Sequence, residues 1–208
     1  MYDVEAFRED RIEVLHALIQ AHPLATLVAV TAQGLEANHI PLLIDPAPAP
    51  FGTLRGHVAR ANPLWRTFSS DTEVLVVFQG AQGYVTPSWY PTKAQTGKVV
   101  PTWNYVVVHA RGPLKIYEDA EWLRKLVTRL TESQESRGEK PWRVTDAPDD
   151  YVDTMLKGIV GIEIPVRHLQ GKWKMSQNRL SQDRNGVIAG LESSTDAASQ
   201  AMLAALRR

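Results

Sequence analysis

Short apolar runs separated by turn residues dominate the first half of the chain, a pattern typical of antiparallel β-strands. The runs 24–31 and 35–44 flank the link Ala32-Gln33-Gly34, and this arrangement predicts a β-hairpin. The other predicted strands lie near residues 52–58, 73–79, 84–86, 102–117 and 159–166.

Apolar residues recur at helical spacing in three regions of the chain. The first helix is predicted near residues 10–22, where Asp10 precedes Glu13 by three positions and Pro23 ends the pattern. The second runs from Asp119 to Arg137, and helical segments near 179–207 close the chain. Mostly consecutive strands with peripheral helices predict one α+β domain over residues 1–208, built on an antiparallel barrel or sheet.

The composition excludes several classes of chemistry. The 208 residues include no cysteine, which rules out disulfides, thiol nucleophiles and cysteine-ligated metals. The six histidines show no metal-ligand spacing, so we expect no metal site. The sequence has no apolar run of about 20 residues and no signal-peptide pattern at its start, so we expect a cytoplasmic protein that does not cross a membrane.

The formal net charge is zero, but the charges are segregated along the chain. Residues 51–115 carry seven basic and two acidic side chains, and residues 157–208 carry eight and four. The remaining blocks, 1–50 and 116–156, are acidic. The two basic blocks could converge on an anionic ligand or could pair with the acidic blocks.

Familiar catalytic and nucleotide-binding motifs are missing. The chain has no G-x-G-x-x-G, no G-x-S-x-G and no H-E-x-x-H. Gly97-Lys98 is followed by Val99, where a phosphate-binding loop requires Ser or Thr. The motifs therefore support neither a dinucleotide fold nor a P-loop.

Three local clusters carry candidate chemistry. Residues 55–65 place Arg55, His57 and Arg60 beside the Asn62-Pro63 helix start, which suits a phosphate, although the spacing alone slightly favours surface ion pairs with an ordinary cap. Residues 84–90 and 101–105 are aromatic and could line a slot for a flat ligand or form a core rim. Residues 171–179 alternate cationic, aromatic and polar side chains, as in a ligand-closing segment or a helix cap.

At these clusters the sequence resembles the PaiB-type FMN-binding negative transcriptional regulators, and the resemblance runs nearly from end to end. Each motif alone is weak, but their ordered combination is specific. The matching segments are Met1-Tyr2 with Phe7, 39–41, 56–65, 78–80, 84–90, 100–105, 158–162 and 171–178.

The resemblance implies a fold and a cofactor. It implies a mainly antiparallel, six-stranded split β-barrel of the pyridoxamine-phosphate-oxidase type with peripheral helices, in which two chains form a homodimer and FMN lies at the interface. The residues that it implies for FMN are Asn38, His39, Ile40 and Pro41 at the ring edge, His57, Arg60 and Asn62 at the phosphate, and Trp103, Asn104, Lys174, Ser176, Gln177 and Asn178 completing the site.

Two functions follow from the resemblance and stay open at this stage. The first is an FMN-binding transcriptional regulator, although the neutral charge and the lack of a recognisable helix-turn-helix do not support direct DNA binding. The alternative is an FMN-dependent oxidoreductase acting on an unknown small molecule, in which the flavin performs the redox chemistry. The sequence assigns no catalytic residue to that reaction.

Overall fold

The computed structural model describes residues 1–136 and 138–207. The described chain forms two compact units that alternate along the sequence. Unit 1 contains residues 1–15, 79–108 and 170–208, and unit 2 contains residues 16–78 and 109–169. The strands β6 (Val74–Val85) and β7 (Thr102–Gly112) begin in one unit and end in the other, so no single cut of the chain separates them.

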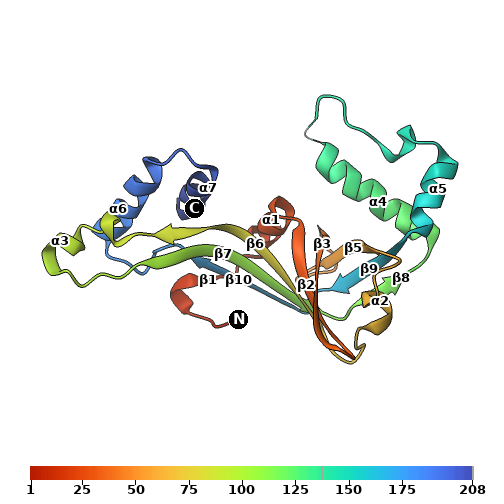
Figure 1. Ribbon diagram of the computed structural model, residues 1–208, viewed down its shortest axis with the longest axis horizontal. Helices are drawn as coiled ribbons and strands as arrows, with labels where there is room; N and C mark the ends of the chain where they lie inside the picture. Colours follow the sequence, from red (N-terminus) through yellow and green to blue (C-terminus); the bar gives the residue numbers. More distant parts are fainter. Residues whose placement is uncertain (137, 208) are drawn as a thin grey trace. The chain divides into compact units, whose positions relative to one another are not determined.

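Unit 1 holds one end of a β-sheet in the order β1-β10-β7-β6 (Figure 1). β1 (Arg8–Glu9) pairs antiparallel with β10 (His168–Lys174). The helices of this unit are η1 (Glu5–Phe7), η2 (Pro87–Trp89), α3 (Thr92–Thr96), α6 (Ser181–Glu192) and α7 (Ala197–Leu206).

The helix α6 packs closely on η2 and α3 because two glycines and a buried carboxylate allow it. A Cβ added at Gly190 would lie 2.4 Å from ring atoms of Trp89, and one at Gly186 would overlap the Trp89 carbonyl. Asp183 is buried and accepts hydrogen bonds from the Thr92 backbone N–H at 3.2 Å and from the Thr92 hydroxyl at 2.8 Å. These contacts fix α6 against the segment 87–92.

Unit 2 holds two sets of strands. The hairpin β2 (Leu24–Thr31) and β3 (Gly34–Pro41) pairs through β2 with β6, and β3 is the outermost strand. A four-stranded sheet has the order β4-β5-β9-β8, and its strands are β4 (Leu43–Asp45), β5 (Thr53–Ala59), β9 (Ile159–Pro165) and β8 (Lys115–Tyr117). Neighbouring strands in both sets run antiparallel.

Helices complete unit 2 (Figure 1). They are α1 (Ile12–Ala21), which starts in unit 1, and α2 (Leu64–Thr67), α4 (Ala120–Glu135), η3 (Val144–Asp146) and α5 (Asp149–Lys157). Leu123 of α4, Val144 of η3 and Leu156 of α5 form one buried apolar cluster. The indole of Trp122 stacks on Tyr117 of β8 with centroids 4.4 Å apart, and it fills the space over Gly161 of β9.

The α+β architecture with antiparallel strands is confirmed, and so is the 24–44 hairpin. The described residues form ten strands rather than six, because the predicted 35–44 and 102–117 runs are each split in two and β1 and β10 were not predicted. Pro113 separates β7 from β8, since proline has no N–H to donate to a sheet. The prediction of two separate strands near 73–79 and 84–86 is wrong, because β6 runs continuously through residues 80–83. Gly83 lets the Met202 side chain approach the strand, where a Cβ would overlap its sulfur.

Two helix predictions were close in position. The predicted helix from Asp119 to Arg137 is observed as α4 with Asp119 as its N-cap, the carboxylate accepting from the Trp122 N–H at 2.7 Å. The last residue of that prediction, Arg137, lies outside the described residues. The helical segments predicted near 179–207 are observed as α6 and α7, and Asp196 caps α7.

Candidate functional site

The two predicted segments of unit 2, 38–41 and 56–62, lie against each other. The side-chain amide of Asn62 donates to Asn38 Oδ1 at 2.7 Å, while Asn62 Oδ1 accepts from the Leu64 N–H at 2.9 Å. A Cβ at Gly56 would lie 2.7 Å from the Pro41 carbonyl oxygen, so glycine permits β5 to approach the end of β3. Unit 2 therefore brings Asn38 and Asn62 together.

The strand β3 presents an open backbone edge within the described residues. It pairs with β2 along its whole length and is the last strand in the sheet order. The Ile40 side chain is buried, whereas His39 and Pro41 are more exposed. An outer strand leaves backbone N–H and C=O groups free on one side, and such groups can recognise the edge of a heterocycle.

Arg60 is held by protein acceptors. Its guanidinium donates to Glu118 Oε2 at 2.5 Å, to the Lys157 carbonyl at 2.7 Å and to the Ile159 carbonyl at 3.1 Å. All three nitrogens of the side chain take part. In this structure Arg60 thus connects the strand end of β5 to the start of β9.

His57 lies on the other face of β5 from Gly56, because successive residues of a strand alternate. Its partner in the register is Gly161, the residue over which Trp122 packs. The Nδ1 atom of His57 is buried and has no hydrogen-bond partner among the described residues. Burial lowers the pKa of His57, which favours the neutral ring.

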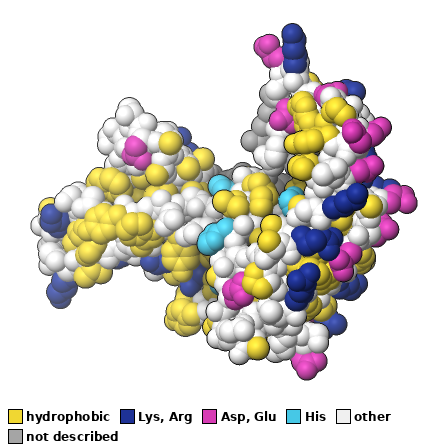
Figure 2. All heavy atoms as spheres, turned by 45° about the vertical axis from the view of Figure 1, so that its right-hand side comes forward, with side chains coloured by type: hydrophobic (Ala, Val, Ile, Leu, Met, Phe, Trp, Pro, Cys, Tyr) yellow, Lys and Arg dark blue, Asp and Glu magenta, His cyan; other side chains and the backbone are white. Residues whose placement is uncertain are grey.

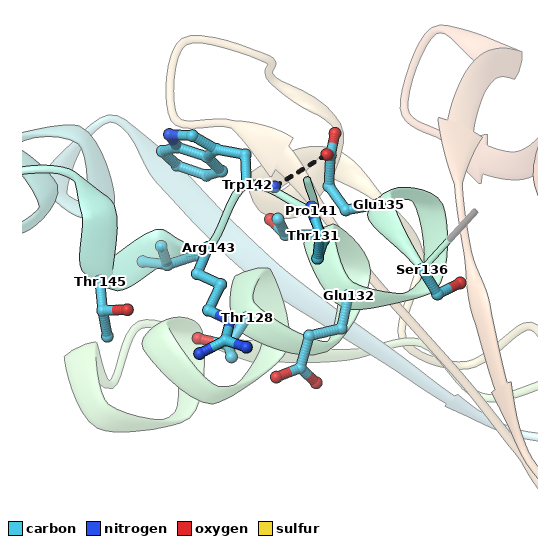
Figure 3. A pocket seen from close by; sticks show the side chains of 10 residues that line it. Thr128, Thr131, Glu132, Glu135, Ser136, Pro141, Trp142, Arg143 and Thr145 are labelled. Atoms are coloured by element: carbon cyan, nitrogen blue, oxygen red, sulfur yellow. Dashed lines mark hydrogen bonds between the residues drawn. The ribbon is translucent and has the colours of Figure 1, made fainter. Parts of the chain in front are cut away.

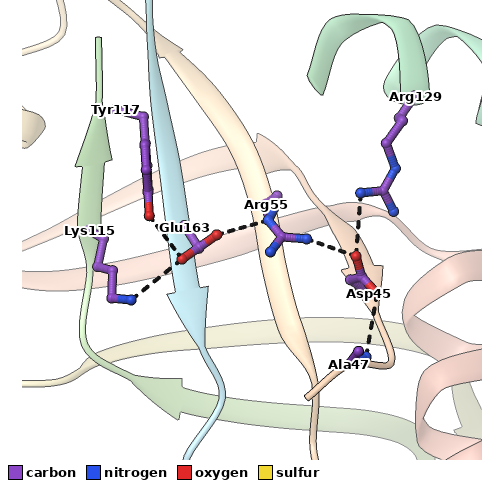
Figure 4. A network of polar contacts seen from close by, with 7 residues as sticks. All are labelled: Asp45, Ala47, Arg55, Lys115, Tyr117, Arg129 and Glu163. Carbon is purple, nitrogen blue, oxygen red and sulfur yellow. Dashed lines mark hydrogen bonds and ion pairs between the residues drawn. The ribbon is translucent and has the colours of Figure 1, made fainter. Parts of the chain in front are cut away.

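Arg55 belongs to a network of ion pairs across the four-stranded sheet (Figure 4). It donates to Glu163 at 2.9 Å and to Asp45 at 2.8 Å. Tyr117 and Lys115 approach the other Glu163 oxygen, and Arg129 of α4 approaches Asp45. The basic side chains of this part of unit 2 are therefore neutralised by carboxylates.

Three neighbouring cations of unit 1, Lys172, Lys174 and Arg179, are among those that form no ion pair in the part of the chain that the structure describes. The Lys172 and Lys174 ammonium groups lie 5.8 and 5.9 Å from the Tyr105 ring centroid. Lys174 donates to the Thr102 hydroxyl at 2.6 Å and to the Trp103 carbonyl at 2.7 Å. Burial lowers the pKa of Lys174, and the charges of Lys172 and Arg179 lower it further, so these cations share one electrostatic field.

Asn104 and Ser176 are buried and bond to each other. The Asn104 amide nitrogen donates to the Ser176 hydroxyl at 3.0 Å, and that hydroxyl lies 3.2 Å from Asn104 Oδ1. Ser176 has a φ of 61°, in the left-handed region that a serine rarely adopts. The pair shapes the backbone of the segment 174–178 from within.

Gln177 fixes the same segment through backbone contacts. Its side-chain oxygen accepts from the Met175 N–H at 2.7 Å, and its amide nitrogen donates to the Trp173 carbonyl. Asn178 is exposed at the end of the segment. The segment 173–177 is therefore held by hydrogen bonds between its own residues.

Trp103 supplies an aromatic surface beside these cations. Its side chain is 50% exposed, and its indole N–H donates to Gln82 Oε1 at 3.1 Å. Tyr84, 52% exposed, meets it edge to face at 6.3 Å. Both rings can contact a flat ligand.

Sequence reasoning left Lys172 and Arg179 out of the predicted site. The signal was present, because Lys172-Trp173-Lys174 alternates along a strand and so places both lysines on one face. Arg179 was less visible from the sequence, since its position depends on how Tyr90 packs: the guanidinium lies 5.0 Å from the centre of the Tyr90 ring.

A cavity of about 420 Å³ in unit 2 contains no predicted site residue. It lies between the C-terminal half of α4 and the segment 141–145, with Glu132 and Arg143 among its walls (Figure 3). One Glu135 oxygen accepts from the Trp142 backbone N–H at 3.0 Å. The predicted chemistry lies elsewhere in the unit.

The described residues form no group of three or more histidines and carboxylates placed to hold a metal ion. In the same part of the chain, no helix is both long and apolar enough to span a bilayer.

Comparison with known sequences gives a family match. Residues 1–168 match the family described as "Putative FMN-binding domain". The chain is 35% identical to the "Protease synthase and sporulation protein PAI 2" of Bacillus subtilis over 193 residues, covering 92% of this chain and 89% of that protein. It is 38% identical to the "Uncharacterized protein AN0679" of Emericella nidulans over 234 residues, covering 95% and 93%.

Solved structures share the fold at low sequence identity. The flavocytochrome Anf3 of Azotobacter vinelandii superposes with a TM-score of 0.57 at 11% identity, covering 83% of this chain and 72% of that one. A "putative 5-nitroimidazole antibiotic resistance protein" of Bacteroides thetaiotaomicron gives 0.53 at 14% identity, covering 79% and 84%.

The residues of each unit fit the chemistry of FMN. In unit 1, Lys172, Lys174 and Arg179 are cations without a carboxylate in the described chain, which suits a phosphate, and Trp103 offers a flat apolar surface. In unit 2, β3 offers an open backbone edge, and the buried Nδ1 of His57 lacks a partner among those same residues.

Proposed function

The chain belongs to the PaiB-like family of FMN-binding proteins, and on that premise we propose that it is a homodimeric, cytoplasmic regulator that represses transcription and carries FMN. The binding of FMN follows from the family. The regulatory role is supported by the Bacillus subtilis relative, whose name refers to protease synthesis and sporulation.

One observation carries the proposal: the cluster of Lys172, Lys174 and Arg179 has no carboxylate partner among the described residues. Other arginines, such as Arg55 and Arg60, are paired. Neighbouring cations repel one another, and a bound anion offsets this repulsion. We assign the cluster to the FMN phosphate, with Lys174 as a donor.

The chain's own groups would bind and orient the cofactor. Lys174 is held by Thr102 and the Trp103 carbonyl, which leaves its third N–H for a phosphate oxygen. The Trp103 ring would contact the flavin face. FMN itself, when bound, supplies a redox-active ring.

An exposed apolar surface on unit 1 supports a homodimer. Figure 2 shows hydrophobic side chains gathered over the part of unit 1 that carries α3. Large exposed side chains in the unit include Tyr84, Val100, Trp103 and Leu180. In a two-fold symmetric dimer, the surface on each chain would be covered by the same surface of its partner.

The charge distribution bears on how a regulator of this kind would meet DNA. Around α4 and α5, basic and acidic side chains are intermixed (Figure 2). Arg124 pairs there with Asp149 and Asp153, and Lys125 pairs with Glu121. Repression would therefore rely on a small contact surface presented twice by the dimer rather than on a broad basic face.

The test uses the purified, FMN-loaded protein. We expect sedimentation to give a dimer at micromolar concentration, and genomic fragments retained at physiological salt to share a sequence that the FMN-free protein does not enrich. A stable monomer, or retention without any shared sequence, would refute the proposal. Repeated bleaching of the flavin by NADPH with turnover of a small molecule would instead favour the oxidoreductase.

A further inference from the structure

Unit 1 contains a cavity of about 460 Å³ on the face of β10 opposite the lysines. Trp173, which lines it, alternates with Lys172 and Lys174 along the strand and so points to the other side. The N-terminal segment and the end of α7 complete the walls. The volume lies within the range of roughly 300 to 1,000 Å³ that small-molecule sites occupy.

The charges around the cavity favour an anion. Three arginines, Arg8, Arg11 and Arg184, line it together with one acidic residue, Glu9. Both oxygens of Glu9 are already bound by Arg11, at 2.8 and 2.5 Å, and this bond lowers the pKa of Glu9, so it stays ionised and paired. Arg8 pairs with Asp3 at 2.5 Å. Among the described residues, Arg184 is therefore the lining arginine without a carboxylate.

Arg184 has the donors that an incoming anion needs. Within residues 1–136 and 138–207, its side chain makes one hydrogen bond, from Nη2 to the Leu206 carbonyl at 3.1 Å. A guanidinium carries five N–H donors in a planar fork that matches a carboxylate. Most of the Arg184 fork thus has no partner among the described residues beside the cavity.

Apart from Gln177, the remaining walls are apolar. Trp173, Met175 and Leu206 are buried, and each lines the cavity. The walls from Trp173 onward lie beyond residue 168, where the family match ends. Lys172, Lys174 and Arg179 are not among the residues that line the cavity, although Gln177 of the segment 174–178 is.

We propose that this cavity binds a small organic carboxylate with an apolar body, its carboxylate on the Arg184 guanidinium and its body against Trp173. The Arg184 guanidinium, which has no carboxylate partner among the described residues, accounts for the charge of the ligand, and the buried walls account for its apolar part. The cavity shares Gln177 with the predicted FMN residues, but the proposal does not depend on assigning Lys172, Lys174 and Arg179 to the phosphate.

Phenylacetate is a suitable probe, with 2-phenylethanol as its neutral counterpart. In calorimetric titrations of the full-length protein, we expect phenylacetate to bind and 2-phenylethanol not to bind detectably. Arg184→Gln should weaken phenylacetate by about 10- to 100-fold, because one charged hydrogen-bonding group is lost.

Arg167→Gln is the matched control, since Arg167 is an exposed arginine of unit 2 with a single long contact to Glu73. It should bind phenylacetate as the parent does. Absence of phenylacetate binding, equal binding of 2-phenylethanol, or unchanged affinity in Arg184→Gln would each overturn the proposal. Titration of FMN into the same samples is a separate readout. A failure of phenylacetate to bind would not affect the FMN assignment, and a failure of FMN to bind would not affect the proposed carboxylate site.

Discussion

Ser176 adopts a left-handed backbone conformation, and the buried Asn104 holds it there. Such strain persists where the surroundings enforce it, often beside a ligand. Asn104 is fully buried, so we expect it to act by shaping the segment that follows Lys174 rather than by contacting FMN directly.

Replacing Asn104 with alanine should therefore affect both folding and binding. Asn104→Ala leaves the Ser176 hydroxyl buried without its partner, which costs about 1–3 kcal/mol. We expect urea unfolding to show that loss and FMN titration to show weaker binding. Unchanged stability together with unchanged FMN affinity would contradict the positioning role.

Arg60 offers the contrasting case of a cation already occupied by protein groups. Arg60→Ala removes bonds to the Lys157 and Ile159 carbonyls and to Glu118, so we expect a loss of about 1–3 kcal/mol in unfolding free energy. FMN and riboflavin should be affected alike. If only FMN affinity fell and riboflavin affinity did not, Arg60 would contact the FMN phosphate, as the sequence predicted. Glu118→Gln is the control variant, because it breaks the same ion pair while keeping the arginine.

At the scale of elements, the position of α6 depends on two glycines that accept Trp89. Gly190→Ala should destabilise the protein although alanine favours helices by about 1 kcal/mol, because the added carbon would lie 2.4 Å from the Trp89 ring. We expect overpacking to cost about 1–3 kcal/mol in urea unfolding. Asn185→Ala, at an exposed position of α6, is the control and should be neutral or slightly stabilising; an increase in stability for Gly190→Ala would contradict this packing.

The N-cap of α7 gives a pH-dependent prediction. Hydrogen bonds from Ser194 and Ser199 lower the pKa of Asp196 from 3.8 to about 2. Because the folded pKa lies below the unfolded one, the stabilisation is present above about pH 4 and is lost as the pH falls towards 2. Asp196→Ala should lower the melting temperature at neutral pH, and the difference from the parent should shrink near pH 2. A constant difference across that range would be inconsistent with a charged cap.

Sequence patterns predicted some of these elements correctly and missed others. The 24–44 hairpin was predictable because alternation and a Gly-containing link coincide there. The continuity of β6 through Gly80 and Gly83 was not, since glycines in a strand signal a turn until the packing of Met202 against Gly83 is known. Long-range contacts of this kind leave no local trace in the sequence.

Across the whole molecule, the two basic blocks of the sequence differ in whether their cations pair with carboxylates. In residues 51–115, Arg55 and Arg60 pair with Asp45, Glu163 and Glu118, as the ion-pairing alternative allowed. In residues 157–208, Lys172 and Lys174 remain without a carboxylate in the described chain. Composition showed that both blocks were basic, but only tertiary contacts distinguish a paired cation from an available one.

The central claim is that Lys174 holds the phosphate of FMN. The most direct measurement compares the affinities of FMN and riboflavin, which lacks the phosphate, for the parent and for Lys174→Gln. Glutamine retains N–H donors for Thr102 and the Trp103 carbonyl while removing the charge. We predict that FMN binding weakens by about 10- to 100-fold and that riboflavin binding is unchanged. Unchanged FMN affinity, or an equal loss for both ligands, would contradict the account.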